Sequence, residues 1–178
     1  MYPKAYIDYL IHFHGDRDYF ECHEILEEYW KEVDPNNKQS IWVGLILLAV
    51  SNYHHRRGNF PGAEKTIAKS IAILKNEKRQ LLQLGIDTEQ LMNDLPLKHE
   101  DISLQIPYTS YMIPITDPIL IESCNAGCID RGFIWGSASD LNNREIVHRH
   151  SSRDRSSIIQ ERLDALKKSH SPTHRKRQ

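Results

Sequence analysis

The chain has 178 residues, of which 39% are hydrophobic and 26% are charged, and its formal net charge is −1. This composition is that of an ordinary soluble protein, and the length predicts one domain with a substantial core. The longest apolar run, Ile41 to Val50, is too short to span a bilayer, which excludes a membrane protein.

The first residues of the chain lack the apolar segment of a secretory signal. The cysteines are three in number, Cys22, Cys124 and Cys128, and an odd set in such a chain is typical of reduced thiols. We therefore expect a cytoplasmic protein without a membrane partner.

The charge is unevenly distributed along the chain. Residues 144–178 carry ten basic and four acidic side chains, a net of +6, whereas residues 1–143 carry 13 basic and 20 acidic ones, a net of −7. A basic segment on an acidic body predicts contact with the body of its own or a second subunit, as in a homodimer, or with nucleic acid. The basic segment has no interleaved aromatic residues, so docking on the body is the favoured interpretation.

Apolar residues recur three and four positions apart over the first half of the chain, which predicts helices. We expect helices near 3–14, 17–33, 38–57 and 61–84, and a short one at 88–95. Asp16 or Asp18 is the expected N-cap of the second helix. At the turn after the third helix, Gly58 suits the left-handed position that ends a helix, and Asn59 suits the N-cap of the next one. The predicted fold class is all-α, a multi-helix orthogonal bundle.

The character of the sequence changes after Pro96. Prolines among apolar residues between 105 and 122 predict an irregular extended strap across the bundle, and a Gly-, Ser- and Asn-rich stretch at 123–140 predicts a loop. Helical spacing returns at 142–168. We therefore divide the single domain into a bundle core (1–98), a strap and loop (99–141) and a basic C-terminal helix and tail (142–178).

Two short motifs lie in the second predicted helix and at the turn after the third: His23-Glu24-x-x-Glu27-x-x-Trp30 and Arg57-Gly58-Asn59-x-x-Gly62-Ala63. Together they resemble the domain-of-unknown-function 309 family, small all-helical proteins of bacteria, archaea and plastids. The segments 104–121 and 146–162 are similar to the longer Bacillus-type members. The resemblance implies an all-helical fold, and the label sometimes given to the family implies a metal-dependent hydrolase.

Phe20, His23, Glu27 and Trp30 form one stripe of the second helix, so a histidine and a carboxylate are expected on its inward face. Buried polar groups need partners. One interpretation is a divalent metal site with His23, Glu27 and a histidine of the third helix, His54 or His55. In that case Glu24 is the candidate general base.

The other interpretation is a polar network or ligand pocket without catalysis. In it, Glu27 pairs with Arg57 or Arg56 at the end of the third helix. His23 bonds to Tyr53 or a nearby carboxylate, and Asn59 lies in the turn. We rank this non-catalytic binding or structural module first, the metal-dependent hydrolase second, and a nucleic-acid-binding accessory protein acting through residues 142–178 third. Whether the protein is an enzyme stays open at this point.

Overall fold

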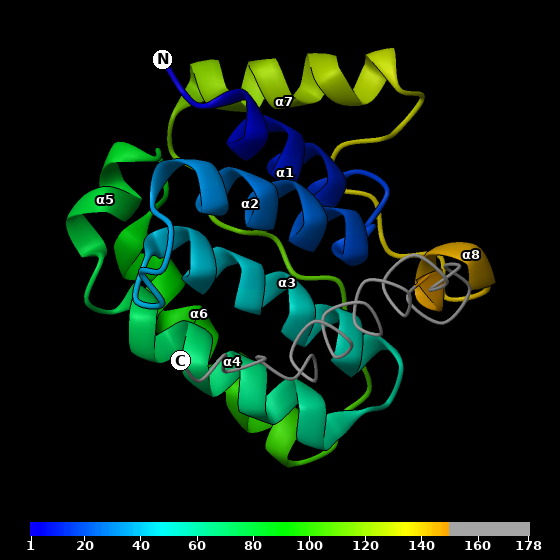
Figure 1. Cartoon of the computed structure of the whole chain (residues 1–178). Helices are drawn as coiled ribbons and strands as arrows, with labels where there is room; N and C mark the ends of the chain where they lie inside the picture. The colour runs from blue at the N-terminus through cyan, green and yellow to red at the C-terminus, as the bar shows by residue number, and fades with distance from the viewer. Residues whose placement is uncertain (150–178) are drawn as a thin grey trace, which may run out of the picture.

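The chain folds into an all-α bundle, as predicted (Figure 1). The computed structural model describes residues 1–149, and within this range it contains eight helices and no β-strand. The helices are α1 (Lys4–His14), α2 (Tyr19–Val33), α3 (Ile41–Arg56), α4 (Phe60–Leu74), α5 (Lys78–Gln83), α6 (Thr88–Ser103), α7 (Pro118–Asp130) and α8 (Arg144–Val147). No helix in this range is long and apolar enough to cross a membrane.

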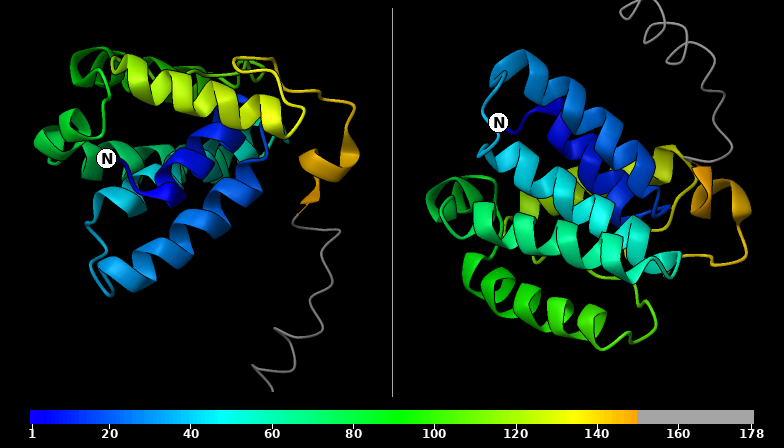
Figure 2. Two further views of the ribbon diagram at one scale, coloured as in Figure 1. Left: turned by 90° about the horizontal axis from the view of Figure 1, so that it is seen from above. Right: turned by 60° about the horizontal axis from the view of Figure 1, so that its bottom comes forward.

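The helices pack in a series, with α7 on α1, α1 on α2, α2 on α3, α3 on α4 and α4 on α6. Figure 1 shows α7, α1, α2, α3 and α4 from top to bottom, and the right view of Figure 2 shows α6 below α4. α3 is buried toward both α2 and α4, which explains why it is apolar nearly all round. α3 and α4 approach closely at Gly44, where a Cβ atom would lie only 2.5 Å from Cδ2 of Leu74.

The predicted caps of α2 and α4 and the predicted turn after α3 are present. Asp18 caps α2 by accepting a hydrogen bond from the backbone N–H of Glu21 (3.0 Å). Gly58 has φ of 69°, the left-handed conformation that costs a glycine little. Asn59 then caps α4 through its side-chain oxygen. These local contacts fix the tight turn between α3 and α4.

Two helix boundaries differ from the prediction. The expected helix at 61–84 is interrupted after Leu74, where the Asn76 amide donates to the carbonyl of Ala72 and competes with the helical hydrogen bonds. The expected short helix at 88–95 instead continues through Pro96 to Ser103, because Leu91, Leu95 and Ile102 all bury one face of α6. Burial of this face outweighs the cost of the internal proline.

The predicted loop at 123–140 is wrong in its first part, which belongs to α7. Asp117 caps α7, and Pro118 follows in its first turn, where no helical hydrogen bond is lost. The buried face of α7 consists of Leu120, Cys124 and Cys128, and it packs on α1. Because this face has one leucine and two cysteines, the helical spacing of its buried residues is difficult to recognise in the sequence. The irregular strap spans residues 104–117, shorter than the predicted 105–122, because residues 118–122 belong to α7.

Arg17 connects the strap to the bundle through hydrogen bonds. It is almost fully buried, and its guanidinium donates to the carbonyls of Phe13 (2.9 Å), Tyr111 (2.6 Å) and Ser137 (2.8 Å). These acceptors belong to α1, to the strap and to the segment after α7. One buried side chain therefore joins three parts of the chain that are distant in sequence.

The C-terminal predictions reach beyond the described residues. The structure places α8 at Arg144–Val147, and Arg149 pairs with Asp18 and Glu21 at the start of α2. The remainder of the predicted basic helix and tail, 150–178, lies outside the described residues. The predictions of docking on the body and of nucleic-acid binding rest mainly on this part of the chain.

Candidate functional site

The core-facing side of α2 differs from the predicted stripe. Tyr19, Cys22 and Leu26 are fully buried, whereas the side chains of His23 and Glu27 keep 32% and 34% of their surface exposed. The predicted stripe is therefore rotated toward the edge of the helix. His23 and Glu27 are reached by water, so neither carries the full desolvation cost of a group in the core.

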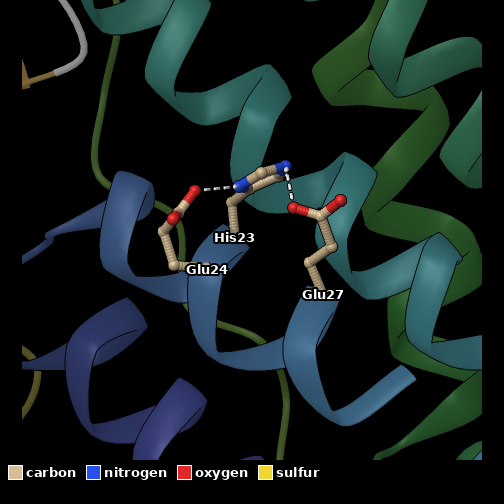
Figure 3. Close-up of side chains that lie close together, drawn as sticks. All are labelled: His23, Glu24 and Glu27. Atoms are coloured by element: carbon tan, nitrogen blue, oxygen red, sulfur yellow. Dashed lines mark hydrogen bonds and ion pairs between the residues drawn. The ribbon is translucent and has the colours of Figure 1, made fainter. Parts of the chain in front are cut away.

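His23 lies between two carboxylates of its own helix (Figure 3). Its Nδ1 atom is 3.0 Å from Oε1 of Glu24, and its Nε2 atom is 3.6 Å from Oε2 of Glu27. Glu27 also pairs with Lys31, one turn further on, at 3.0 Å. Each ring nitrogen of His23 thus faces a different acceptor, which fixes the orientation of the ring.

His23, Glu24 and Glu27 are also a candidate metal site, because one ligand atom from each lies within 4.8 Å of the others. Imidazole nitrogen and carboxylate oxygen are ligands that suit Zn²⁺ and other divalent ions. In the observed pairing, however, His23 presents a different nitrogen to each glutamate, and an ion bonds one nitrogen only. His23 Nε2 and Glu27 therefore fit an ion directly, while Glu24 takes the place of an outer partner that orients the ring.

Next to His23, a pocket of about 340 Å³ opens between α2 and α3. It is lined by Tyr19, Phe20, His23, Val50, Tyr53, His54 and Arg57. This volume lies at the lower end of the range for small-molecule sites. Aromatic and aliphatic side chains form most of its wall, and the polar groups come from His23 on one side and from the end of α3 on the other.

Arg57 contributes a positive charge at the end of α3. It donates from Nη1 to the Tyr53 hydroxyl (3.1 Å), and its guanidinium carbon lies 5.1 Å from the centre of the Tyr53 ring. The structure therefore pairs Arg57 with Tyr53, whereas Glu27 pairs with His23 and Lys31 rather than with Arg57. The expected salt bridge between α2 and α3 is replaced by contacts within each helix.

The two adjacent histidines of α3 have different places. His54 lines the pocket, and its Nδ1 atom is 3.0 Å from the amide nitrogen of Asn59. His55 points away from the pocket, where its Nε2 atom contacts the carbonyl of Ile106 (2.8 Å) and burial lowers its pKa. A shared metal site with His23 can therefore draw on His54 and not on His55.

Sequence reasoning missed the contribution of Tyr19 and Val50 to the wall of the pocket. A signal was present in α3, where Val50, Tyr53, His54 and Arg57 are spaced by three, one and three residues and so share one helix face. Phe20 and His23 lie three residues apart on α2, on the side of that helix that faces these α3 residues. The pocket lies between these two faces.

Comparisons with known proteins place the chain among uncharacterised relatives. A family model described as "Domain of unknown function (DUF309)" matches residues 6–66, which include α2, α3 and the whole pocket. The chain is 48% identical over 162 residues to the uncharacterized protein YpuF of Bacillus subtilis, covering 91% of this chain and 93% of that protein. No solved structure matches the chain.

Proposed function

Since the chain belongs to the domain-of-unknown-function 309 family, whose description assigns no activity, we propose from the geometry that it is a binding module whose pocket between α2 and α3 holds a small molecule. The observation that carries the proposal is the pocket itself. It gathers His23, Tyr53, His54 and Arg57, four side chains that the sequence marks as candidates, around a concave apolar wall. An apolar cavity with a few convergent polar groups is the usual form of a small-molecule site.

The supports of the pocket are rigid, which favours binding over a purely structural role. Its residues lie on two helices that pack against each other, and Tyr19 is held from behind by the Tyr108 hydroxyl (2.6 Å) and by the Arg56 guanidinium, 4.9 Å from its ring centre. A site built on packed helices keeps its shape before the ligand arrives, so little ordering entropy is lost on binding.

The proposal is tested by filling the pocket. We expect indole and benzamide, small flat probes, to shift the backbone amide NMR signals of Phe20, Val50 and Tyr53 in the full chain. Val50→Trp places a large ring in the cavity and should abolish these shifts. Val33→Trp, the same substitution at the exposed end of α2, is the control and should leave them intact. Probe-induced shifts confined to other surfaces, or equal in both variants, would contradict the proposal.

A metal-dependent hydrolase is the second candidate, favoured by the closeness of His23, Glu24 and Glu27. Catalytic zinc sites use three protein ligands and an open position. His23 Nε2 and Glu27 supply two here, and His54 lies on the same pocket as a third donor. The ion would supply a Lewis acid beside the cavity, and Glu24 would hold the His23 ring in position.

Metal analysis separates the two candidates. The hydrolase predicts stoichiometric zinc, iron or manganese in protein purified without a histidine tag, and loss of that metal in His23→Ala. His99→Ala is the matched control, because His99 also lies beside a glutamate, Glu64, at 4.0 Å on another surface. Metal content near zero in the unmodified protein, or equal loss in both variants, would reject the hydrolase and leave the binding module.

A further inference from the structure

We infer that the ligand of the α2–α3 pocket is an organic anion, a carboxylate or phosphate carried on a compact, flat apolar body. The inference rests on the proposed function and adds the chemical class of the ligand. It follows from the charges and hydrogen-bond donors at the α3 end of the pocket and from the shape of its apolar wall.

Arg57 brings a positive charge to the pocket. Within residues 1–149, no aspartate or glutamate lies within 4.0 Å of its guanidinium, and its contacts there are the hydroxyl and the ring of Tyr53. These contacts hold the guanidinium in place without neutralising it. One of its five N–H donors is used by Tyr53, so several remain for a planar acceptor. Carboxylates and phosphates match this fork of donors.

The Asn59 amide determines which ring nitrogen of His54 carries the proton. The side-chain oxygen of Asn59 accepts from the backbone N–H of Gly62 (3.2 Å), which orients the Asn59 amide so that its nitrogen faces Nδ1 of His54 (3.0 Å). Nδ1 is then the acceptor, and the neutral ring carries its proton on Nε2. The cap of α4 thereby fixes the tautomer of a ring that lines the pocket beside Arg57.

The ends of α3 and α4 also carry partial charges, because the peptide dipoles of a helix add along its axis. The end of α3 carries a partial negative charge of about one half, which disfavours an anion, and the start of α4 carries a similar positive one. Both lie at the same tight turn around Gly58, so they largely cancel. The full charge of Arg57 then dominates this end of the pocket. Glu24 and Glu27 make the α2 end acidic, which orients an anion toward α3.

The rest of the pocket wall is apolar. Tyr19, Phe20 and Val50 line this wall with apolar carbon and carry no charge. A flat apolar body buries its surface against them, and the hydrophobic effect gives about 25 cal/mol for each Å² that is removed from water. An anion without such a body, for example inorganic phosphate, would leave this part of the cavity unfilled.

The experiment titrates the full chain with benzoate, phenyl phosphate and benzamide, and reads dissociation constants from the amide signals of the pocket. Benzamide has the shape of benzoate without its charge. We expect both anions to bind about 10- to 100-fold more tightly than benzamide, the ratio that charge-assisted hydrogen bonds give. Arg57→Gln should remove this preference, so that within the variant benzoate and phenyl phosphate bind no more tightly than benzamide. Arg79→Gln, at an exposed arginine of α5, is the control and should keep the preference.

Two outcomes would overturn the inference, and they differ from failure of the proposed function. Benzamide binding as tightly as benzoate, or an anion preference that survives in Arg57→Gln, would reject the anionic ligand while the pocket remains a binding site. If none of the three probes shifts the signals of Phe20, Val50 or Tyr53, the binding module itself is rejected.

Discussion

Arg17→Met tests whether a single buried arginine holds the strap to the bundle. Methionine has a similar length and no donors, so the substitution keeps most of the packing and removes the hydrogen bonds to Phe13, Tyr111 and Ser137. Arg17 also has φ of 61°, a conformation that methionine shares at the same strain. The difference in unfolding free energy between the unmodified protein and Arg17→Met therefore measures the contribution of the guanidinium to stability.

The magnitude follows from the three acceptors. A buried carbonyl left without a donor costs about 1–3 kcal/mol. The bond to Phe13 is fully buried, whereas those to Tyr111 and Ser137 are partly exposed, so water replaces the donor there at a lower cost. Removing the buried charge returns part of its desolvation penalty. We expect a net loss of about 2–4 kcal/mol, a large fraction of a typical folding free energy of about 5–15 kcal/mol.

Equilibrium urea denaturation followed by circular dichroism measures this loss. Arg79→Met, at an exposed arginine, is the control and should stay within about 0.5 kcal/mol of the unmodified protein. Arg17→Lys keeps the charge but not the fork of donors, so an intermediate loss is expected. An unfolding free energy of Arg17→Met equal to that of Arg79→Met would refute the role assigned to Arg17.

Three further predictions concern stability. Gly44→Ala should cost about 1–2 kcal/mol in urea denaturation, because overpacking against Leu74 exceeds the gain in helix propensity, and a double-mutant cycle with Leu74→Val should show recovery. Asn59→Ala should cost about 1 kcal/mol by loss of the α4 cap, and an unchanged urea midpoint would contradict this. Burial lowers the pKa of His14 from its usual 6.5 to about 3, so the unfolded chain binds a proton that the folded one excludes. Stability present above pH 6.5 should therefore fall by about 1.4 kcal/mol per pH unit as the pH drops from 6.5 toward 3. His14→Phe should lack this slope; an equal slope in both proteins would argue against it.

The parts of the fold that local chemistry determines were predictable. Asp18, Gly58 and Asn59 act within a few residues of themselves, so their roles follow from the sequence around them. α7 and the second half of α6 were not predictable in this way. Their helices depend on faces that are buried only when α1 and α4 are in place, and these tertiary contacts outweigh local preferences at Pro96 and Gly127.

For the site, the sequence indicated the correct helices but not the correct partners. His23, Tyr53, His54 and Arg57 line one pocket, whereas His55 faces away from it. Adjacent residues of a helix point about 100° apart, and the width of a buried face is similar. Helical spacing therefore does not decide which of two adjacent histidines faces the pocket. It also says nothing of how closely two helices pack, so it does not predict a pocket between α2 and α3.

A crystal structure of the full chain grown with phenyl phosphate tests the central claim most directly. The account predicts the phosphate within hydrogen-bond distance of Arg57 and the phenyl ring against Phe20 and Val50, with the neighbouring helices unmoved. A well-ordered pocket without the compound, at concentrations where solution binding is saturated, would contradict the assignment of this pocket as the binding site.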